Sequence, residues 1–196
     1  MKPIDTIDAC RTSHRLLIES LAPLTDVDFR APSLLPRYSR GHVVMHIANK
    51  SKAHALIFGG AAAGEVRQIH PDGYDPDLAA DLGANRSAAM LRSDLAECLE
   101  ILEATWDALD DGLWGRQGLM AAGPRTMAEI ALHHLRNVEV HHVDLDIGHR
   151  PCDWPSILVE GELPKRLRSL PDRADAADIL AWLLGRAPAP ELAGPW

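Results

Sequence analysis

Apolar residues recur every three or four positions in four long stretches of the chain, the spacing of one face of an α-helix. The first stretch covers about residues 4–22, and the second begins at an N-cap, Ser39, and ends at Gly59 and Gly60. The third, residues 78–109, keeps the spacing over about eight turns. Each stretch is therefore predicted to form one helix.

A capping signature, "TMAE", opens the fourth stretch. The Thr126 hydroxyl is expected to accept a hydrogen bond from the Glu129 amide, while the Glu129 side chain reaches back to the start of the helix. This helix should run through a histidine-rich segment to about Leu145. Prolines in "TDVDFRAPSLLPRY" predict a linker there, and "ADAADILAWLLGR" predicts a last amphipathic helix that Gly185 stops.

Four principal helices with long connections and no alternating strand pattern predict an all-α, up-and-down four-helix bundle with a short C-terminal helical extension. We expect the bundle to span residues 1–150 and the extension to span 151–196. A chain of 196 residues can bury a stable core without cross-links. Its three widely spaced cysteines argue against a disulfide framework or a thiolate zinc knuckle.

Charge and hydropathy exclude several classes of partner. The net charge is −8, and lysines and arginines are scattered, which makes nucleic-acid binding a poor prediction. The N-terminus has no apolar run after its lysine, and no stretch approaches 18 consecutive apolar residues, so neither export nor membrane spanning is expected. We expect a cytoplasmic protein, a monomer or homodimer, that acts on a small molecule.

Histidines are the strongest compositional clue, because five of the ten fall within 17 positions, from 133 to 149. In a helix His134, either Asn137 or Val138, and His141 share one stripe. His142 is turned by about 100 degrees from His141, so at most one of this pair binds a given ion.

The second predicted helix carries His42 and His46 four residues apart. A bundle can bring such a histidine to face one on another helix, and imidazoles with a carboxylate or amide suit zinc or a similar divalent ion. The alternative is ordinary packing, hydrogen bonding or solvation. That alternative is favoured for His42, His133, His134 and His142.

Two segments, "LPRYSRGHVVMHIA" and "RNVEVHHVDLDIG", resemble the signatures of the mycothiol-dependent maleylpyruvate isomerase family, whose N-terminal domain is a DinB-like four-helix bundle. Weaker matches, "ANR", "CDWP" and "AWLLGR", follow in the right order. The resemblance implies a divalent metal, usually zinc, and mycothiol or another low-molecular-weight thiol as cofactor.

Carried across, the resemblance makes His46 and His141 metal ligands and places Asn137 where the family has a glutamate. An asparagine offers a carbonyl oxygen without charge, so the site is expected to bind metal weakly or to be altered or empty. Glu139 lies about 200 degrees around the helix from His141 and cannot replace the missing glutamate. Asp144 is a candidate partner that orients His141, with capping of the turn as the alternative.

The resemblance implies a metal-assisted, thiol-dependent cis–trans isomerase of an unsaturated dicarboxylate such as maleylpyruvate, with Arg86 as a candidate for the substrate carboxylate. Arg86 could equally be a solvated helix residue. A thiol S-transferase, in which the thiol is not expelled, uses the same site. A third alternative is a non-catalytic, metal-free bundle that binds a small molecule or a partner. About 40 residues follow Trp154 in this sequence, so we expect the family's C-terminal domain to be shortened here.

Overall fold

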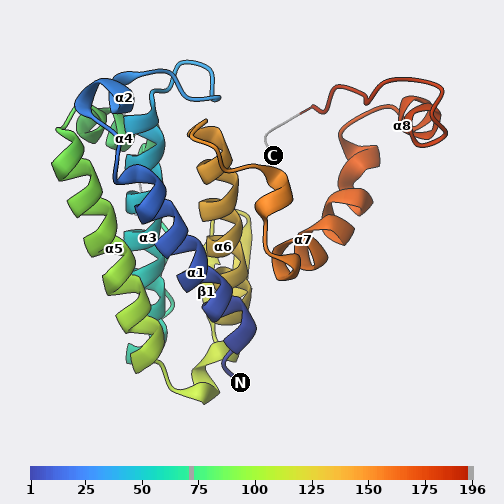
Figure 1. Ribbon diagram of the computed structural model, residues 1–196. Helices are drawn as coiled ribbons and strands as arrows, with labels where there is room; N and C mark the ends of the chain where they lie inside the picture. Colours follow the sequence, from blue (N-terminus) through green and yellow to red (C-terminus); the bar gives the residue numbers. More distant parts are fainter. Residues whose placement is uncertain (71–72, 194–196) are drawn as a thin grey trace. The chain divides into compact units, whose positions relative to one another are not determined.

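The computed structural model describes residues 1–70 and 73–193, and four long helices build its main body (Figure 1). They are α1 (Ile4–Leu21), α3 (Arg40–Ala63), α5 (Ala88–Ala108) and α6 (Met127–Asp144). Helices α1 and α3 each pack against both α5 and α6. This arrangement confirms the predicted all-α four-helix bundle.

Two of the four helices run in each direction. The N-termini of α3 and α5 both lie against the short helix α2 (Asp26–Arg30), where Arg40 N–H donates to the Ala31 carbonyl and Ala88 N–H donates to the Asp26 carboxylate. The C-terminus of α6 lies at the same end, because Leu34 N–H donates to the Asp144 carbonyl. The chain between α3 and α5 therefore returns along the bundle before α5 begins.

Both predicted N-caps are present. Ser39 Oγ accepts a hydrogen bond from His42 N–H, and the His42 ring accepts one from Ser39 N–H in return. At the start of α6, Thr126 Oγ1 accepts from Glu129 N–H and the Glu129 carboxylate accepts from Thr126 N–H at 2.8 Å. These bonds satisfy orphan donors of the first helical turn and fix where each helix begins.

The predicted end of the second helix at Gly59 and Gly60 is wrong, because α3 continues to Ala63 and stops at Gly64, which has a φ of 80°. A run of alanines, the best helix formers, follows the two glycines and carries the helix through them. Gly60 leaves room for a neighbouring side chain, because a Cβ at this position would lie 2.7 Å from Arg67 Cγ.

The third predicted helix is two helices, α4 (Pro76–Ala84) and α5. Ser87 interrupts it, because its hydroxyl caps α5 by accepting from Met90 N–H. The leucine stripe does not mark one buried face. Leu82 on α4 is 77% exposed, whereas Leu91 and Leu95 on α5 are fully buried.

Several short elements have no counterpart in the sequence prediction. Helix α2 interrupts the predicted linker, capped by a reciprocal pair of bonds between Thr25 and Asp28. Strands β1 (Gln117–Met120) and β2 (Gly123–Thr126) form an antiparallel hairpin before α6. Each strand has four residues, and their sequences, "QGLM" and "GPRT", do not alternate between apolar and polar residues. The 3₁₀ turns are η1 (Asp111–Gly115), η2 (Pro151–Asp153) and η3 (Leu170–Asp172).

The chain divides into two compact units, Met1–Trp154 and Pro155–Trp196. The second contains α7 (Ser156–Ser169), which the sequence prediction missed, and α8 (Ala176–Leu183), which it included. Gly185, with a φ of 68°, follows α8 as expected. The predicted domain boundary after residue 150 stays a prediction.

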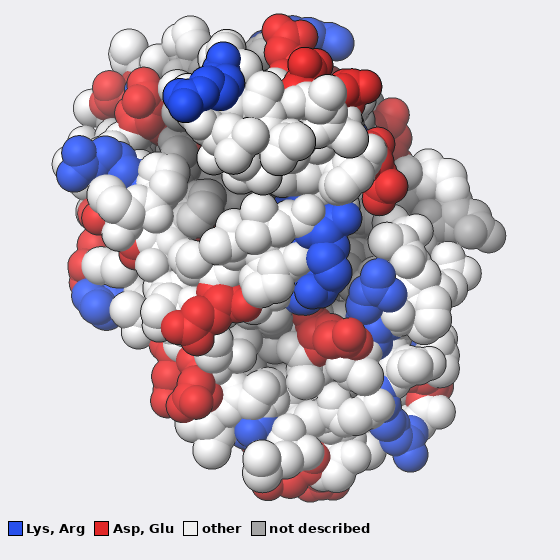
Figure 2. All heavy atoms as spheres, turned by 90° about the vertical axis from the view of Figure 1, so that its right-hand side faces the viewer, with Lys and Arg blue, Asp and Glu red and all other residues white. Residues whose placement is uncertain are grey.

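The core of the bundle is apolar and lies where its helices meet. Its fully buried members include Leu17 of α1, Ile47 of α3, Leu95 of α5 and Val138 of α6. On the face shown in Figure 2, basic and acidic side chains are interspersed, without a broad patch of one sign. Within the part of the chain that the structure describes, no helix has the length and apolarity needed to cross a membrane.

Candidate metal centre

The three predicted metal ligands lie together where α3 packs against α6. His46 Nε2 is 3.3 Å from Asn137 Oδ1, and the rings of His46 and His141 meet edge to face with centroids 4.6 Å apart. Asn137 and His141 lie one turn apart on the same face of α6, as the spacing predicted. Two imidazoles and one amide oxygen therefore converge, although whether they bind metal stays a prediction.

His141 is held by a carboxylate on its own helix. Its Nδ1 lies 2.8 Å from Asp144 Oδ2, and both side chains are largely buried. A hydrogen bond from Nδ1–H to the carboxylate selects the tautomer whose Nε2 lone pair is available to a ligand. This contact is the one expected of a residue that orients a metal-binding histidine.

Asn137 is only partly satisfied. Its side chain is 8% exposed, and its Nδ2 has no hydrogen-bond partner among the residues the structure describes. Leaving such a donor buried and unpaired costs about 1–3 kcal/mol. The amide thus behaves as part of a polar site that is incomplete without a further group.

Burial keeps His46 neutral. It lowers the pKa of this imidazole to about 4, and electrostatic interactions with His141 and Lys50 act in the same direction. Because a metal binds only the neutral imidazole, this shift favours ligation at neutral pH.

A small cavity with space for about one water molecule adjoins His46 and is lined also by Lys50, His70 and Tyr74. Lys50 Nζ lies 3.3 Å from His70 Nε2, and the His70 ring stacks on Tyr74 with centroids 4.2 Å apart. Burial lowers the pKa of Lys50. The sequence already placed the charge of Lys50 next to the candidate site. Sequence reasoning missed His70 and Tyr74, which belong to a connection without periodicity.

No group of three histidine, cysteine or carboxylate side chains suited to a metal occurs within residues 1–70 and 73–193. The converging set here includes an amide in place of a carboxylate. The chemistry of the donors is therefore that of a neutral site, which holds a divalent cation less tightly than a site with a carboxylate.

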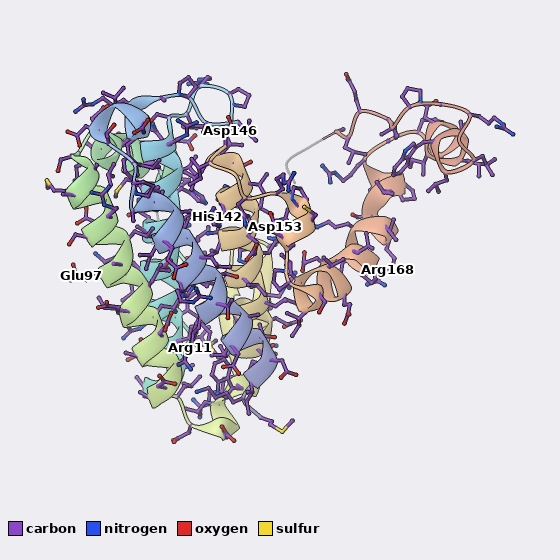
Figure 3. All side chains as sticks on the ribbon, viewed as in Figure 1. Arg11, Glu97, His142, Asp146, Asp153 and Arg168 are labelled. Atoms are coloured by element: carbon purple, nitrogen blue, oxygen red, sulfur yellow. The ribbon has the colours of Figure 1, made fainter. Side chains whose placement is uncertain are left out.

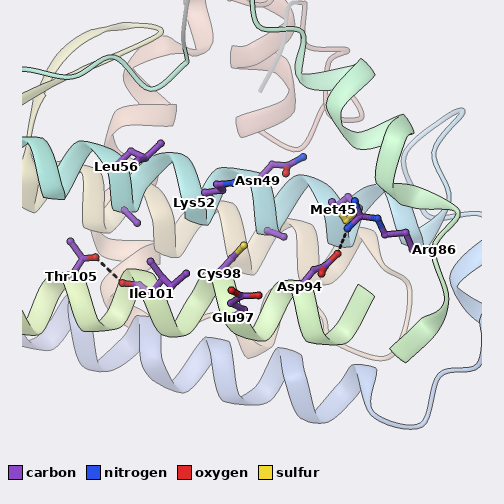
Figure 4. Close-up of a pocket in the computed structure, with 12 residues that line it drawn as sticks. Met45, Asn49, Lys52, Leu56, Arg86, Asp94, Glu97, Cys98, Ile101 and Thr105 are labelled. Carbon is purple, nitrogen blue, oxygen red and sulfur yellow. Dashed lines mark hydrogen bonds and ion pairs between the residues drawn. The ribbon is translucent and has the colours of Figure 1, made fainter. Parts of the chain in front are cut away.

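Arg86 is not brought to these residues by any described contact. It forms an ion pair with Asp94 and lines a groove of about 460 Å³ between α3 and α5, together with Lys52 and Cys98 (Figure 4). Asn49 lines both this groove and the small cavity beside His46. A role for Arg86 toward substrate stays a prediction, and it would require Arg86 to leave or share its carboxylate partner.

Glu139 faces away from the candidate centre, as the helical geometry predicted. It is 2% exposed, its Oε1 accepts a hydrogen bond from Ser13 Oγ, and its Oε2 lies 2.7 Å from His149 Nε2. Ser13 on α1 and His149, which follows α6, occupy both oxygens of this carboxylate. It is therefore unavailable to take the place of the glutamate that the family resemblance implies at position 137.

The other histidines of the motifs have ordinary partners. His142, on α6 (Figure 3), lies 2.9 Å from Ser20 Oγ and stacks on His149 with centroids 4.0 Å apart. His42 Nε2 lies 3.1 Å from the Asp81 carboxylate. His134 is fully buried among other rings. These contacts are hydrogen bonds, an ion pair and ring packing, and the expectation that these histidines bind no metal stays a prediction.

Comparison with known proteins identifies the bundle. The model of the mycothiol maleylpyruvate isomerase N-terminal domain matches residues 10–146. No curated relative matches the sequence. Two solved structures, a mycothiol-dependent maleylpyruvate isomerase and a histidine-to-alanine mutant of it, each have a TM-score of 0.75 and 20% identity with this chain.

Each comparison covers 80% of this chain and 65% of the solved one, so the chain spans about two thirds of the length of those isomerases. At this identity the likeness shows a common fold, the DinB-like bundle expected from the sequence. The family match covers most of the chain and includes both segments that carry the candidate ligands. The chain belongs to the mycothiol maleylpyruvate isomerase N-terminal domain family.

Proposed function

We propose that this protein is a thiol-dependent cis–trans isomerase of an unsaturated dicarboxylate such as maleylpyruvate, with mycothiol as the thiol and a divalent metal, zinc in the first instance, at the α3–α6 site. The observation that carries the proposal is the convergence of His46, Asn137 and His141, two of them within 3.3 Å of each other. The names of the family and of its solved members support the choice of reaction.

The residues present fit a divalent cation, because His46 Nε2, Asn137 Oδ1 and His141 Nε2 would supply it with three neutral lone-pair ligands. The buried, unpartnered amide N–H of Asn137 requires an acceptor, which an anionic ligand beside the cation would supply. A cation bound there would supply a Lewis acid that favours the thiolate form of a bound thiol.

The chain's own residues bind and orient the reactants. Asp144 fixes the His141 ring, and Lys50, on the wall of the adjoining cavity, provides a cation for a substrate carboxylate. In the proposed reaction, the thiolate sulfur adds to one carbon of the cis double bond. The resulting single bond rotates, and expulsion of the thiolate re-forms the double bond as trans. The thiol is recovered, so one equivalent serves many turnovers.

A direct experiment separates this function from its rivals. Zinc-loaded protein is incubated with mycothiol and maleylpyruvate, and both product and free thiol are quantified. Fumarylpyruvate with unconsumed thiol is the expected result. A stable conjugate would assign the protein as an S-transferase, and absence of both products would favour the non-catalytic bundle, for which the neutral side chain of Asn137 is the argument.

The matched variants for this assay both lie on α3. His46→Ala should abolish turnover because it removes a donor of the site. His42→Ala should keep it, since His42 pairs with Asp81 outside the site. Equal activity in the two variants would contradict the assignment of His46.

A further inference from the structure

A chain of hydrogen-bonding groups crosses the interior of the bundle, with one member on each of its four helices. Glu103 on α5 lies 2.6 Å from His14 Nδ1 on α1, and His14 Nε2 lies 2.8 Å from His134 Nε2 on α6. His134 Nδ1 then lies 3.1 Å from His54 Nδ1 on α3. None of these four hydrogen-bonded residues is one of the three candidate metal ligands.

The chemistry of the groups fixes where the protons lie when all three rings are neutral. An ionised carboxylate only accepts, so His14 carries its proton on Nδ1 and offers a lone pair at Nε2. His134 must then donate from Nε2 and accept at Nδ1, and His54 must donate from Nδ1. The last nitrogen, His54 Nε2, is left as an acceptor.

That last acceptor is buried and has no hydrogen-bond partner among the described residues, in a side chain that is fully buried. Burial lowers the pKa of both His54 and His134 well below the usual value, which agrees with neutral rings. If these four side chains served packing alone, apolar side chains would give a more stable fold, because a buried polar group without a partner lowers the free energy of unfolding. The unpartnered His54 Nε2 therefore indicates a hydrogen-bond donor that binds there transiently.

The two ends of the chain lie in different surroundings. The Glu103 side chain is 30% exposed, and its second oxygen lies 3.5 Å from Arg11 Nε on α1, which Figure 3 labels. At the other end, His54 follows Lys50 by one helical turn and His46 by two, about 12 Å along α3. One end thus meets solvent, and the other lies two helical turns along α3 from the candidate centre.

We propose that Glu103, His14, His134 and His54 form a proton relay between the interior of the bundle and solvent. A proton accepted at His54 Nε2 displaces the proton on His54 Nδ1 to His134 Nδ1. The proton on His134 Nε2 passes to His14 Nε2, and the proton on His14 Nδ1 passes to the Glu103 carboxylate, which releases it to water. One proton enters and one leaves, and the three rings remain neutral in inverted tautomers.

The donor at the inner end is a bound acid, and the thiol of the proposed reaction is one; Lys50 stands between His46 and His54 along α3. That point alone rests on the proposed function. The relay itself is a property of the resting protein, so it is tested without metal, thiol or substrate, and a failure of the isomerase assay leaves the result of this test unaffected.

The test is nuclear magnetic resonance of the ¹⁵N-histidine-labelled full chain at neutral pH, read as the protonation of each ring nitrogen. We expect His14 and His54 to carry the proton on Nδ1 and His134 to carry it on Nε2. Any other tautomer at one of these rings would overturn the proposal. This measurement needs no variant and does not depend on whether a mutant folds.

A pair of variants on α5 then tests proton transfer. Glu103→Gln keeps an oxygen that accepts from His14 Nδ1–H but cannot take up the proton, whereas Glu100→Gln changes an exposed carboxylate one turn away. Exchange of the His134 Nε2 proton with solvent should slow by about tenfold or more in Glu103→Gln and stay unchanged in Glu100→Gln. Equal exchange rates in the two variants would refute the relay.

Discussion

Replacing Asp144 tests whether the α3–α6 site is a metal centre that the fold has organised. The Asp144 carboxylate lies 2.8 Å from His141 Nδ1 and is only 15% exposed, so the bond between them is charge-assisted and weakly screened. Such a bond contributes about 1.5–3 kcal/mol. Removing an outer partner of a ligating histidine costs about 10–100-fold in metal affinity, or roughly 1.4–2.7 kcal/mol, which agrees with that value.

The two possible substitutions should therefore differ. Asp144→Asn keeps an oxygen that accepts from Nδ1–H, so zinc affinity should fall by about tenfold. Asp144→Ala removes the acceptor, and the loss should approach a hundredfold, with the tautomer of His141 no longer fixed. The measurement is a competition titration of chelator-stripped protein with zinc and a chromophoric chelator at neutral pH.

Asp146→Asn is the matched control, two residues away. Asp146 is 64% exposed at its side chain and has a φ of 53°, a conformation that asparagine also tolerates. Its ion pair with Arg40, at 3.9 Å, is exposed and contributes little. Zinc binding by this variant should equal that of the wild type. Equal binding in Asp144→Ala as well would refute the reasoning that Asp144 orients a ligand.

Asn137→Glu should raise zinc affinity in the same titration, because a carboxylate offsets part of the charge of the cation and a neutral amide does not; unchanged affinity would mean that position 137 is no ligand. Glu139→Gln should leave zinc binding intact but lower the free energy of unfolding by about 1–3 kcal/mol in urea, since one of its two buried bonds loses its acceptor. The depressed pKa of His54 means that the unfolded chain binds more protons below about pH 6.5, so stability should fall as pH drops below that value, and less so in His54→Leu. Leu95→Ala should lower the free energy of unfolding by about 2–5 kcal/mol, and Leu82→Ala should lower it by less than about 0.5 kcal/mol. A larger loss in Leu82→Ala than in Leu95→Ala would contradict the burial of α5 in the core.

The sequence predicted the elements whose signals are local. Ser39 and Thr126 carry their capping partners within three residues, so the starts of α3 and α6 were predicted correctly. Spacing alone also placed Asn137 and His141 on one face of α6, with Glu139 on another. In each case the deciding geometry is that of a single helix, which is the same in every fold.

One failure passed over a local signal, and the others lie where tertiary packing decides. Leu82 and Leu91 are nine residues apart, and the gap between them contains Gly83 and Ser87, the residue that caps α5. Gly60 resembles a helix end but is required by the close approach of Arg67. Similarly, the partners of His134 come from α1 and α3, more than 75 residues away along the chain, so the histidine chain could not be predicted from the α6 motif.

The amide at position 137 changes the electrostatics of the site more than its shape. The three candidate ligands are two imidazoles and an amide, and none of them brings a negative charge. Lys50 on the cavity wall adds a positive charge. Asp144 is a nearby anion, but its charge is directed to His141 Nδ1, away from the ligand side of the ring. A glutamate at position 137 would offset part of the positive charge of a cation in the site, whereas an asparagine would leave that charge uncompensated. The substitution therefore favours an anionic partner from outside the chain, such as a thiolate or a carboxylate, over a neutral one.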